Sequence, residues 1–560
     1  MAETRTAADA LAEWAKKTPE RVFLTQPFEG EVREWTFSQA HDDAARFAAA
    51  LLKLGLTRGD KVAILSKNCA EWLIADVAIS MAGLVSVPIY PTAGADMIGY
   101  ALKHSEARAV IVGRLDDPGP AREAIPSDVA TIGLRYPGMD CQQDWQTMID
   151  SNDPVAEPYR PTSDEMMTIL YTSGSTGQPK GVVISYGAYE YASMVCVDSL
   201  GFLPEDRALS YLPLAHITER TVVVGPAIYS GCHLFFVDKL ATFQADLLRC
   251  EPTLFISVPR LWVQFQIGVH KKMPPEKLDR LLRIPLVRNV VARKLRRGLG
   301  LHNCRLIGSG SAPISPATLR WYEAIGVHIS EGWGMSETTG LACTNTPFQS
   351  ECIGTIGKPL PKTEMKLNDV GEILIRSPGL FTEYYKQPDL TAEVFNEDGF
   401  FHTGDKGEWD ESIQAFRITG RVKEIFKSAK GKYVTPVPIE GKLAGNPLID
   451  QVCVMGSGLR APVAVVVPAT AAGESPREDV DASLAATLRE VNESLESHER
   501  LATIFVVEAA SGGGGKGMCS MITDKLSRMP TPPLVSSLIS SVQVPSVLIS
   551  SNAARLPSGR

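Results

Sequence analysis

The sequence predicts an α/β protein: a large N-terminal domain of several subdomains, with doubly wound sheets and a small β-rich subdomain, and then a small α/β C-terminal domain. Three observations lead to this prediction. The chain has 560 residues, whereas single hydrophobic cores stop growing at about 250–300 residues. Short apolar segments alternate with helical segments of about 10–15 residues, as in β–α–β units on parallel sheets. Beyond residue 360 the segments become shorter and more strand-like.

The individual elements follow from hydrophobic periodicity. Helices are expected over 36–54, where Thr36 and Gln39 have capping-box spacing, over 70–81 and near 95–104. Strands are expected at 61–65, 85–89, 109–112, 166–171, 233–237, 254–258, 305–308 and 327–330, and then at 372–376, 400–409 and 416–418. The small domain is predicted from strands near 452–455, 463–467 and 504–507 and a helix near 481–495. Gly- and Ser-rich loops follow several strands, where doubly wound sheets bind their ligands.

These changes of pattern set the predicted domain boundaries. Residues 1–420 form the N-terminal domain, 421–423 join it to the next part and 424–510 form a small domain. The tail 511–560 is rich in glycine and serine and is expected to be disordered or the product of a frameshift.

Composition narrows the class of protein. The net charge of −8 argues against a nucleic-acid scaffold. Ten scattered cysteines without a Cys-x-x-Cys pair argue against a zinc ribbon, an iron–sulfur site or a disulfide framework. No apolar run reaches the ~18 residues of a spanning helix, and no signal peptide begins the chain, so a soluble cytoplasmic protein is expected.

One loop carries the groups that bind a phosphate. Tyr171-Thr-Ser-Gly-Ser-Thr-Gly-Gln-Pro-Lys180-Gly181 follows an apolar segment. Its glycines leave backbone N–H groups open to an anion, its hydroxyl groups add donors and its lysine adds positive charge. The candidate phosphate-binding residues are Thr172, Ser173, Gly174, Ser175, Thr176, Gly177 and Lys180. The loop is not a Walker A motif, because Gly-x4-Gly-Lys-Ser/Thr is absent from the chain.

This loop closely resembles the signature of adenylate-forming enzymes, which include acyl-CoA synthetases, adenylation domains of peptide synthetases and luciferases. A second segment, Glu331-Gly-Trp-Gly-Met-Ser-Glu337, also resembles a motif of that family. The resemblance implies that Trp333 lies against adenine, with Gly334 in the same site. It also implies that Ser336 contacts the α-phosphate and that Glu337 holds Mg²⁺. Thr172, Lys180 and Glu337 are therefore expected to act in catalysis.

Further motifs of the family follow in the expected order. The resemblance of Phe401-His-Thr-Gly-Asp405 implies that Asp405 binds the ribose. That of Thr419-Gly-Arg421 implies that Arg421 reaches the ribose and the α-phosphate. It also implies that 421–423 is a hinge centred on Lys423 and that the small domain 424–510 is mobile. The remaining nucleotide-site residues that the resemblance implies are Gly310, Ser311, Ala312 and Gly431.

Two segments resemble the long-chain fatty acyl-CoA synthetase branch. They are Tyr211-Leu-Pro-Leu-Ala-His216 and Ser257-Val-Pro-Arg260-Leu-Trp262, and the resemblance places His216 beside the acyl and nucleotide pocket as a catalytic candidate. It implies a long-chain fatty acid–CoA ligase that uses ATP, Mg²⁺ and CoA. Such an enzyme first forms acyl-adenylate and pyrophosphate, and CoA then displaces AMP. A serine hydrolase is disfavoured, because Gly-x-Ser-x-Gly is absent.

The C-terminal end departs from the family. Relatives end in a segment like Thr-Pro-Thr-Leu-Lys, whose lysine stabilises the transition state of adenylation, and no such segment follows residue 508. Three interpretations stay open. A frameshift or altered terminus has replaced the native end, or Lys525 or Lys516 substitutes for the lysine, or the chain binds ATP and acyl-adenylate but is impaired in adenylation. Loss of a cation that acts in the transition state leaves binding intact.

Residues 270–305 form a basic stretch of eleven lysines and arginines, with only Glu276 and Asp279 as carboxylates. Apolar residues are interleaved with these charges. Such a segment either lies on an anionic membrane or is a solvated pair of surface helices whose arginine stems cover apolar neighbours. The sequence alone favours the second interpretation and leaves peripheral contact with the inner membrane face open. It fixes neither acyl chain length nor oligomeric state.

Overall fold

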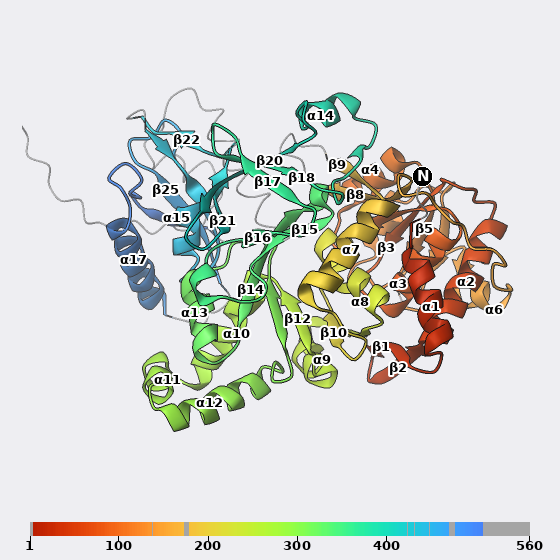
Figure 1. The fold of residues 1–560 in the computed structure, drawn as a ribbon, viewed down its shortest axis with the longest axis horizontal. Coiled ribbons are helices and arrows are strands. Elements are labelled where there is room, and N and C mark those ends of the chain that lie inside the picture. The colour runs from red at the N-terminus through yellow and green to blue at the C-terminus, as the bar shows by residue number, and fades with distance from the viewer. Residues whose placement is uncertain are drawn as a thin grey trace, which may run out of the picture.

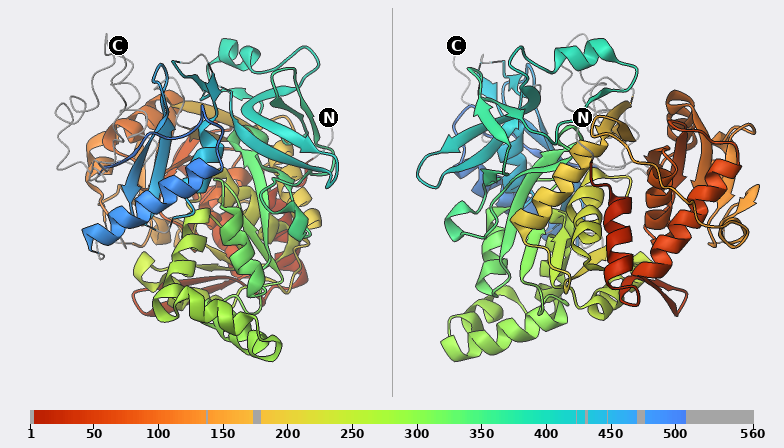
Figure 2. Two further views of the ribbon diagram at one scale, coloured as in Figure 1. Left: turned by 90° about the vertical axis from the view of Figure 1, so that its left-hand side faces the viewer. Right: turned by 45° about the vertical axis from the view of Figure 1, so that its right-hand side comes forward.

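The computed structural model describes residues 4–136, 138–172, 179–422, 424–429, 432–446, 448–469 and 476–507. Two large sheets with helices packed around them form most of the molecule, and a four-stranded sheet and a small C-terminal unit adjoin them (Figures 1 and 2). The arrangement confirms the predicted α/β fold class.

The eight-stranded sheet has the order β19-β9-β8-β4-β3-β5-β6-β7. Its strands are β3 (Lys61–Leu65), β4 (Val85–Ile89), β5 (Ala107–Val112), β6 (Ala130–Gly133), β7 (Gln143–Asp144), β8 (Met166–Thr172), β9 (Lys180–Ser185) and β19 (Glu383–Tyr384). Strands β8 to β7 in this order run parallel, whereas β9 turns back antiparallel to β8. The strands predicted at 61–65 and 85–89 form the middle of this sheet.

The helices of the N-terminal part are α1 (Ala7–Lys17), α2 (Phe37–Lys53), α3 (Ala70–Met81), α4 (Ala95–Ser105), α5 (Gly119–Ala124) and α6 (Trp145–Asp150). The predicted capping box begins α2: Gln39 N donates to Thr36 Oγ1 (3.2 Å) and Thr36 N donates to Gln39 Oε1 (2.9 Å). Almost every residue of α3 is buried. This helix therefore belongs to the core, not to the surface.

The nine-stranded sheet has the order β16-β15-β14-β13-β12-β10-β11-β1-β2. Its strands are β1 (Val22–Phe28), β2 (Glu31–Thr36), β10 (Arg207–Ser210), β11 (His233–Phe236), β12 (Leu254–Ser257), β13 (Leu306–Ser309), β14 (Ile329–Met335), β15 (Gly340–Thr344) and β16 (Lys358–Pro359). The associated helices are α7 (Tyr186–Leu200), η1 (Glu219–Val224), α8 (Gly225–Ser230), η2 (Leu240–Thr242), α9 (Phe243–Cys250), α10 (Pro259–Lys272), α11 (Pro275–Leu282), α12 (Pro285–Gly298), α13 (Pro316–Ala324), η3 (Ser336–Thr338) and η4 (Ser350–Cys352).

The prediction of a strand at 327–330 is wrong in its bounds. Strand β14 continues to Met335, because Gly332 and Trp333 pair antiparallel with Thr344 and Cys343 of β15. The motif 331–335 therefore lies within a strand and not in a loop after it. Backbone pairing with a later strand holds its side chains in a fixed alternation.

The segments after residue 360 form the predicted β-rich part. Strands β17 (Glu364–Leu367), β18 (Glu372–Arg376), β20 (Phe401–Asp410) and β21 (Ala415–Arg421) form the four-stranded sheet in that order, and α14 (Pro388–Glu393) precedes β20. The C-terminal unit contains β22 (Phe426–Lys427), β23 (Tyr433–Val434), α15 (Pro436–Leu443), β24 (Ile449–Met455), β25 (Val463–Pro468), α17 (Arg477–Glu493) and β26 (Ile504–Val506). It has a hydrophobic cluster of its own, which includes Val434, Ile439 and Leu484.

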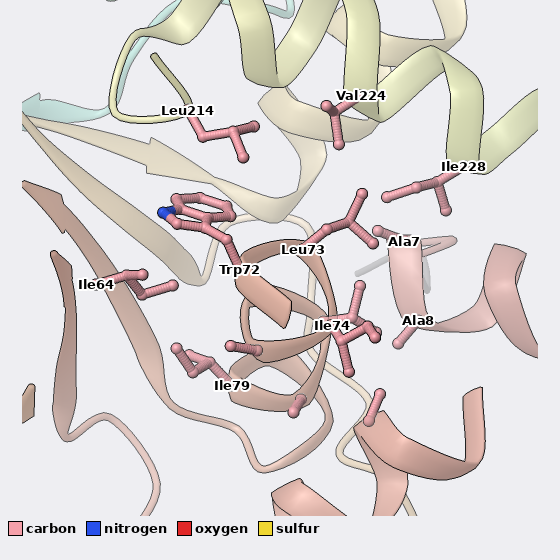
Figure 3. Packing of buried hydrophobic residues seen from close by; sticks show 14 of the residues in the cluster. Ala7, Ala8, Ile64, Trp72, Leu73, Ile74, Ile79, Leu214, Val224 and Ile228 are labelled. Carbon is pink, nitrogen blue, oxygen red and sulfur yellow. The ribbon is translucent and has the colours of Figure 1, made fainter. Parts of the chain in front are cut away.

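Apolar and polar contacts tie the two large sheets together. Leu73 of α3 points toward Val224 and Ile228, and Trp72 belongs to the same core between the sheets (Figure 3). Within this core, both Nη2 bonds of Arg220 to the Asp76 carboxylate are short (2.6 and 2.8 Å). The buried ion pair therefore joins η1 to α3.

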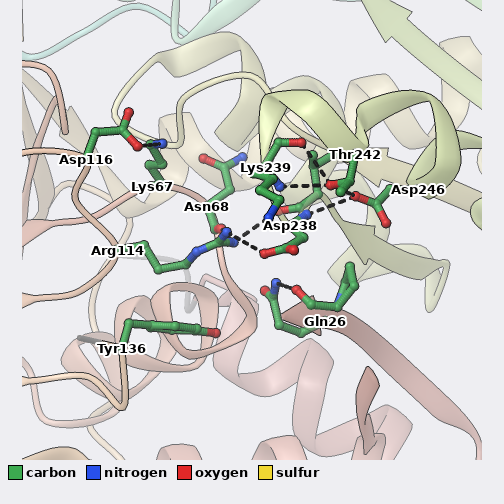
Figure 4. A network of polar contacts seen from close by, with 12 residues as sticks. Gln26, Lys67, Asn68, Arg114, Asp116, Tyr136, Asp238, Lys239, Thr242 and Asp246 are labelled. Carbon is green, nitrogen blue, oxygen red and sulfur yellow. Dashed lines mark hydrogen bonds and ion pairs between the residues drawn. The ribbon is translucent and has the colours of Figure 1, made fainter. Parts of the chain in front are cut away.

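A second polar contact lies at the ends of β5 and β11. The Arg114 guanidinium donates to Val237 O (3.0 Å) and to Asp238 Oδ1 (3.2 Å), and also to Asn68 O (3.3 Å) (Figure 4). Because Arg114 follows β5 and Asp238 follows β11, this contact fixes the carboxyl ends of strands from both sheets relative to each other. Ligands of such sheets bind at this edge.

Candidate functional site

The described ends of the predicted phosphate loop lie opposite each other on adjacent strands. Thr172 ends β8 and Lys180 begins β9, and the two residues are partners in the antiparallel register. Helix α4 supports this place, because Tyr100 Oη donates to Pro179 O (2.9 Å). His104 Nδ1 lies 2.9 Å from the Tyr171 hydroxyl. A helix and two strands thus fix both ends of the loop.

Tyr384 connects the loop lysine to the predicted metal ligand. The Lys180 ammonium lies 4.8 Å from the centre of the Tyr384 ring. The Tyr384 hydroxyl donates to Glu337 Oε1 (2.9 Å). Strand β19 places Tyr384 opposite Val182 of β9, so pairing along the sheet edge brings this residue to the site. The lysine and the carboxylate are therefore held on two sides of one aromatic ring.

A second group joins β14 to the four-stranded sheet. Trp333 Nε1 donates to Asp405 Oδ2 (2.9 Å), and Arg421 Nε lies 2.6 Å from Asp405 Oδ1. Asp405 and Arg421 are direct partners in the β20–β21 register. The Asp405 side chain is 7% exposed and that of Arg421 46%. The arginine therefore keeps donors on its solvent side, while the carboxylate is fixed from two directions.

A pocket opens between β13, β14 and η1. Its apolar walls include Val222, Ile256 and Leu341, and glycines line much of the rest. A Cβ atom on Gly310 would stand 3.0 Å from Gly332 O, and one on Gly334 would stand 1.7 Å from Gly340 O. The register of β14 and β15 shifts at Gly334 and brings Gly340 O close to it. No side chain larger than that of glycine therefore fits at this position.

Polar groups stand on one side of this pocket. Thr218 Oγ1 lies 3.2 Å from Ser311 Oγ, which connects η1 to the loop after β13. The backbone N–H of Thr218 donates to His216 Nδ1 (3.2 Å), which leaves Nε2 of this ring to carry the proton in the neutral form. Ser311 has a positive φ of 66°. The predicted residues Gly310 and Ser311 thus line this pocket together with Thr218, and His216 contacts the backbone of Thr218.

Two buried glutamates, Glu219 and Glu331, have raised pKa values. Burial raises the pKa of Glu219 to about 8, although Tyr211 N donates to its Oε1 (3.1 Å). Burial also raises the pKa of Glu331 to about 8, against a hydrogen bond from Gly354 N (2.8 Å). Both carboxyl groups are therefore largely protonated at neutral pH and are poor ligands for a cation.

The donor set fits a magnesium ion that shares its shell with a ligand. Within the described ranges, no three His, Cys, Asp or Glu side chains gather to hold a metal ion by themselves. Glu337 alone supplies one carboxylate. Mg²⁺ commonly takes one or two protein carboxylates and fills its other positions with phosphate oxygens and water. A single glutamate beside a phosphate loop is consistent with that pattern.

The described structure brings most of the predicted residues together. Thr172, Lys180, Glu337, Trp333, Asp405 and Arg421 lie in the contacts above, Gly334 is in β14, Ser336 begins η3, and the exposed Ala312 follows Ser311. Ser173, Gly174, Ser175, Thr176, Gly177, Lys423, Gly431, Lys516 and Lys525 lie outside the described residues. The sequence reasoning missed Tyr384 and Thr218. The only signal for Tyr384 was a pair of tyrosines in a short strand-like segment.

Comparison with known families agrees with this geometry. The model of the AMP-binding enzyme family matches residues 11–385, which is more than half of the chain. The model of the AMP-binding enzyme C-terminal domain matches residues 424–514. The chain belongs to the AMP-binding enzyme family. This confirms the adenylate-forming family that the segment 171–181 and the later motifs predict.

Relatives in this family point to one branch. The fatty acyl-CoA synthetase A of Dictyostelium discoideum is 32% identical over 498 residues, with 80% of this chain and 74% of that protein covered. The long-chain-fatty-acid–CoA ligase FadD15 of Mycobacterium tuberculosis is 31% identical over 485 residues, with 80% of each chain covered.

Solved structures of the same fold are more distant in sequence. The adenylation domain of the carboxylate reductase from Mycobacterium chelonae has a TM-score of 0.79 at 22% identity, with 93% of this chain and 90% of that chain covered. The anthranilate CoA ligase AuaEII, solved with anthranoyl-AMP, has a TM-score of 0.77 at 22% identity, with 94% and 98% covered. At these identities the likeness concerns the fold of the AMP-binding enzymes.

Proposed function

We propose that this AMP-binding enzyme is a long-chain fatty acid–CoA ligase. Its relatives named fatty acyl-CoA synthetase and long-chain-fatty-acid–CoA ligase support the substrate class. In the first step the fatty carboxylate attacks the α-phosphorus of ATP, which gives acyl-adenylate and releases pyrophosphate. In the second step the thiol of CoA attacks the acyl carbonyl carbon and AMP leaves. The reaction requires ATP, Mg²⁺ and CoA.

The observation that carries the proposal is the contact chain from Lys180 through Tyr384 to Glu337, beside the Trp333–Asp405 pair. Trp333 and Glu337 lie on one continuous segment, β14 followed by η3. Groups suited to an aromatic base, a ribose and a polyphosphate are therefore fixed next to one another. That combination fits a nucleoside triphosphate better than it fits an isolated phosphate.

In this proposal the residues bind and orient the reactants. Trp333 offers a face for adenine stacking, and Asp405 accepts from ribose hydroxyl groups. Lys180 balances the charge of the phosphates, which is the main task of a protein in phosphoryl chemistry. Glu337 would hold Mg²⁺, which supplies Lewis-acid neutralisation of phosphate charge when it is bound. Tyr384 keeps Lys180 and Glu337 at a fixed spacing.

The pocket between β13, β14 and η1 is the proposed place for the first part of the acyl chain. Val222, Ile256 and Leu341 provide apolar contacts there. His216 and Thr218 stand where the carboxylate end would meet the nucleotide. Because the proposed substrate is a lipid, it also supports the membrane interpretation of residues 270–305, which the sequence alone leaves open.

The predicted division of the chain belongs to the same proposal. Residues 1–420 would hold the acyl and ATP sites, and 424–510 would pivot about 421–423 between the two steps. Either Lys525 or Lys516 would supply the missing lysine of adenylation. Without either, the chain would bind ATP and acyl-adenylate but adenylate poorly.

The decisive test measures both half-reactions of the purified full chain. We expect palmitate-dependent ATP–pyrophosphate exchange, and formation of acyl-CoA and AMP when CoA is added. Glu337→Gln should lower exchange about 100-fold, because the variant weakens the ligand for the metal. Glu383→Gln is the matched control, since Glu383 lies on the same edge strand as Tyr384 and should leave exchange unchanged.

Three results separate the alternatives. Exchange together with thioester formation supports the ligase. Transfer from supplied acyl-adenylate to CoA without exchange supports the adenylation-impaired protein. Absence of both activities with every fatty acid tested, in a folded chain, would overturn the proposed function.

A further inference from the structure

Helices α11 and α12 form a hairpin that projects from the body of the molecule (Figures 1 and 2). Only Leu278 of α11 and Ala292 of α12 are fully buried. These two residues belong to the cluster under β12 to β14, which also contains Trp262 of α10. The hairpin is thus anchored along one narrow face, and most of its surface faces outward.

The outward face of α12 begins with apolar side chains. Leu286 is 83% exposed and Val290 is 67% exposed, and Ile284 just before the helix is 48% exposed. Leu286 and Val290 are four residues apart, so they lie above one another on the same helix face. Exposed leucines are ordinary when they occur singly, but several together mark a contact surface.

The same face ends with positive charges. Arg293 and Arg297 continue the spacing of Leu286 and Val290 along the helix. Several exposed cations of the hairpin and of the end of α10 form no ion pair with a described residue. They are Lys272, Lys277, Arg280, Arg283, Arg288, Arg293, Lys294 and Arg297. Only Glu276 and Asp279 oppose them, and both belong to α11.

Helix α9 extends this surface. Gln244 Nε2 donates to Gly298 O (3.0 Å), which joins α9 to the C-terminal end of α12. Leu240 of η2, just before α9, is 91% exposed, and Leu248 of α9 is 44% exposed. Both helices lie at the lower side of the molecule in Figure 1. Exposed apolar groups therefore continue from the hairpin onto the body of the protein.

We infer that this surface, formed by α12 and the adjoining α9, docks onto a membrane that carries anionic lipids. Leu286 and Val290 would enter the boundary between headgroups and acyl chains, while Arg293 and Arg297 contact lipid phosphates. A solvated helix pair would account for the charges, but it leaves Leu286 in water. A nucleic acid would pair with the cations, but it offers no apolar environment for Leu286 and Val290.

The contact would be peripheral. Within the part of the chain that the structure describes, no helix combines the length and the hydropathy of a membrane span. The docking concerns a face of α12 that is separate from Lys180, Tyr384 and Glu337. It goes beyond the ligase proposal, and the two can fail independently, because vesicle binding is measured without ATP, CoA or fatty acid.

The test is vesicle cosedimentation of the full chain. The probes are vesicles of phosphatidylcholine alone and vesicles of phosphatidylcholine with phosphatidylserine, each at low and high salt. We expect binding to the anionic vesicles that weakens as salt rises. L286S/V290S and R293E/K294E/R297E should each raise the vesicle Kd by about 10-fold or more.

Matched controls come from β2, α2, α4 and the segment after β6, outside the hairpin and α9. V32S/L52S removes two exposed apolar groups, and K53E/K103E/R135E reverses three exposed cations, so both should bind like the wild type. Thermal unfolding of each variant checks that the fold is retained. Absence of wild-type binding to anionic vesicles would overturn the inference. Loss on charge reversal with no effect of L286S/V290S would also overturn it, because the surface would then recognise a polyanion and not a bilayer.

Discussion

At the scale of single residues, Tyr384 has two distinct contacts. Its ring lies under the Lys180 ammonium, and its hydroxyl group donates to Glu337. Burial and the neighbouring Glu337 carboxylate raise the pKa of this hydroxyl well above its usual range. The group therefore remains a donor throughout the physiological pH range and orients one carboxylate oxygen permanently.

Tyr384→Phe removes the hydroxyl and keeps the ring. We expect kcat/KM to fall about fivefold, since one hydrogen bond is worth about 1 kcal/mol. The Mg²⁺ concentration for half-maximal rate should rise, because Glu337 loses its fixed orientation. Tyr385→Phe alters the next residue and should change neither quantity. A variant whose Mg²⁺ dependence equals that of the wild type would show that Tyr384 does not orient Glu337.

Glu219 gives a prediction about pH. Its pKa is raised from 4.5 to about 8 by burial. Between these values the folded state binds a proton that the unfolded state has lost, so stability falls as pH rises through this range. The slope from this group is at most about 1.4 kcal/mol per pH unit.

Glu219→Gln keeps an acceptor for Tyr211 N and removes the titration. In urea unfolding followed from pH 5 to 8, the wild type should lose stability relative to the variant as pH rises. Curves for the two proteins that run parallel across this range would mean that Glu219 is ionised in the folded state.

At the scale of elements, α4 supports the phosphate loop from the side. Tyr100 reaches Pro179 O, and His104 reaches Tyr171, so one helix contacts both ends of the loop. The two side chains are four residues apart and stack with ring centres 5.2 Å from each other. The helix thus presents a rigid aromatic pair to the loop.

Tyr100→Phe should raise the KM for ATP severalfold with a smaller effect on kcat, because the loop loses one anchor of about 1 kcal/mol. Initial rates at varied ATP concentration measure this. Tyr136→Phe is the control: it removes a hydroxyl that donates to Glu71 (2.8 Å), away from the loop. We expect it to affect thermal stability and not KM. Equal KM values for the Tyr100 variant and the wild type would contradict a supporting role for α4.

Particular elements show what the sequence could predict. The strands at 61–65 and 85–89 and the helix at 70–81 were predicted with their observed bounds, because each has a local period and turn residues on both sides. The extent of β14 was missed, since it depends on pairing with β15. Tyr384 was missed for the same physical reason: only the β19–β9 register brings it to Lys180. The local sequence pattern therefore predicts individual helices and strands. Contacts between strands that are distant in the sequence cannot be predicted without the fold.

At the scale of the whole molecule, one ion pair between described residues joins α10 to the C-terminal unit. Arg260 Nε of α10 lies 3.2 Å from Asp450 Oδ1 of β24, and the arginine side chain is 69% exposed. An ion pair with this exposure is worth at most about 1 kcal/mol. The contact can therefore bias the position of the small unit without locking it.

Arg260→Ala should change the ratio of the two half-reaction rates by less than about fivefold. The effect should vanish at high salt, where the wild-type pair is screened. Exchange and thioester formation are measured separately at low and high salt. Lys272→Ala, in the same helix, is the comparison. A salt-independent effect would mean that Arg260 acts on the substrate and not through Asp450.

The register of β20 and β21 has a thermodynamic consequence. It pairs Asp405 with Arg421, and β21 ends at Arg421, just before the C-terminal unit begins. A ligand that engages this pair contacts the junction between the two parts of the chain. Linkage is reciprocal: if the ligand favours one orientation of the small unit, that orientation strengthens ligand binding by the same factor. Ligand occupancy of the site and orientation of the small unit are then coupled in one equilibrium. A measurement of either quantity reports on the other.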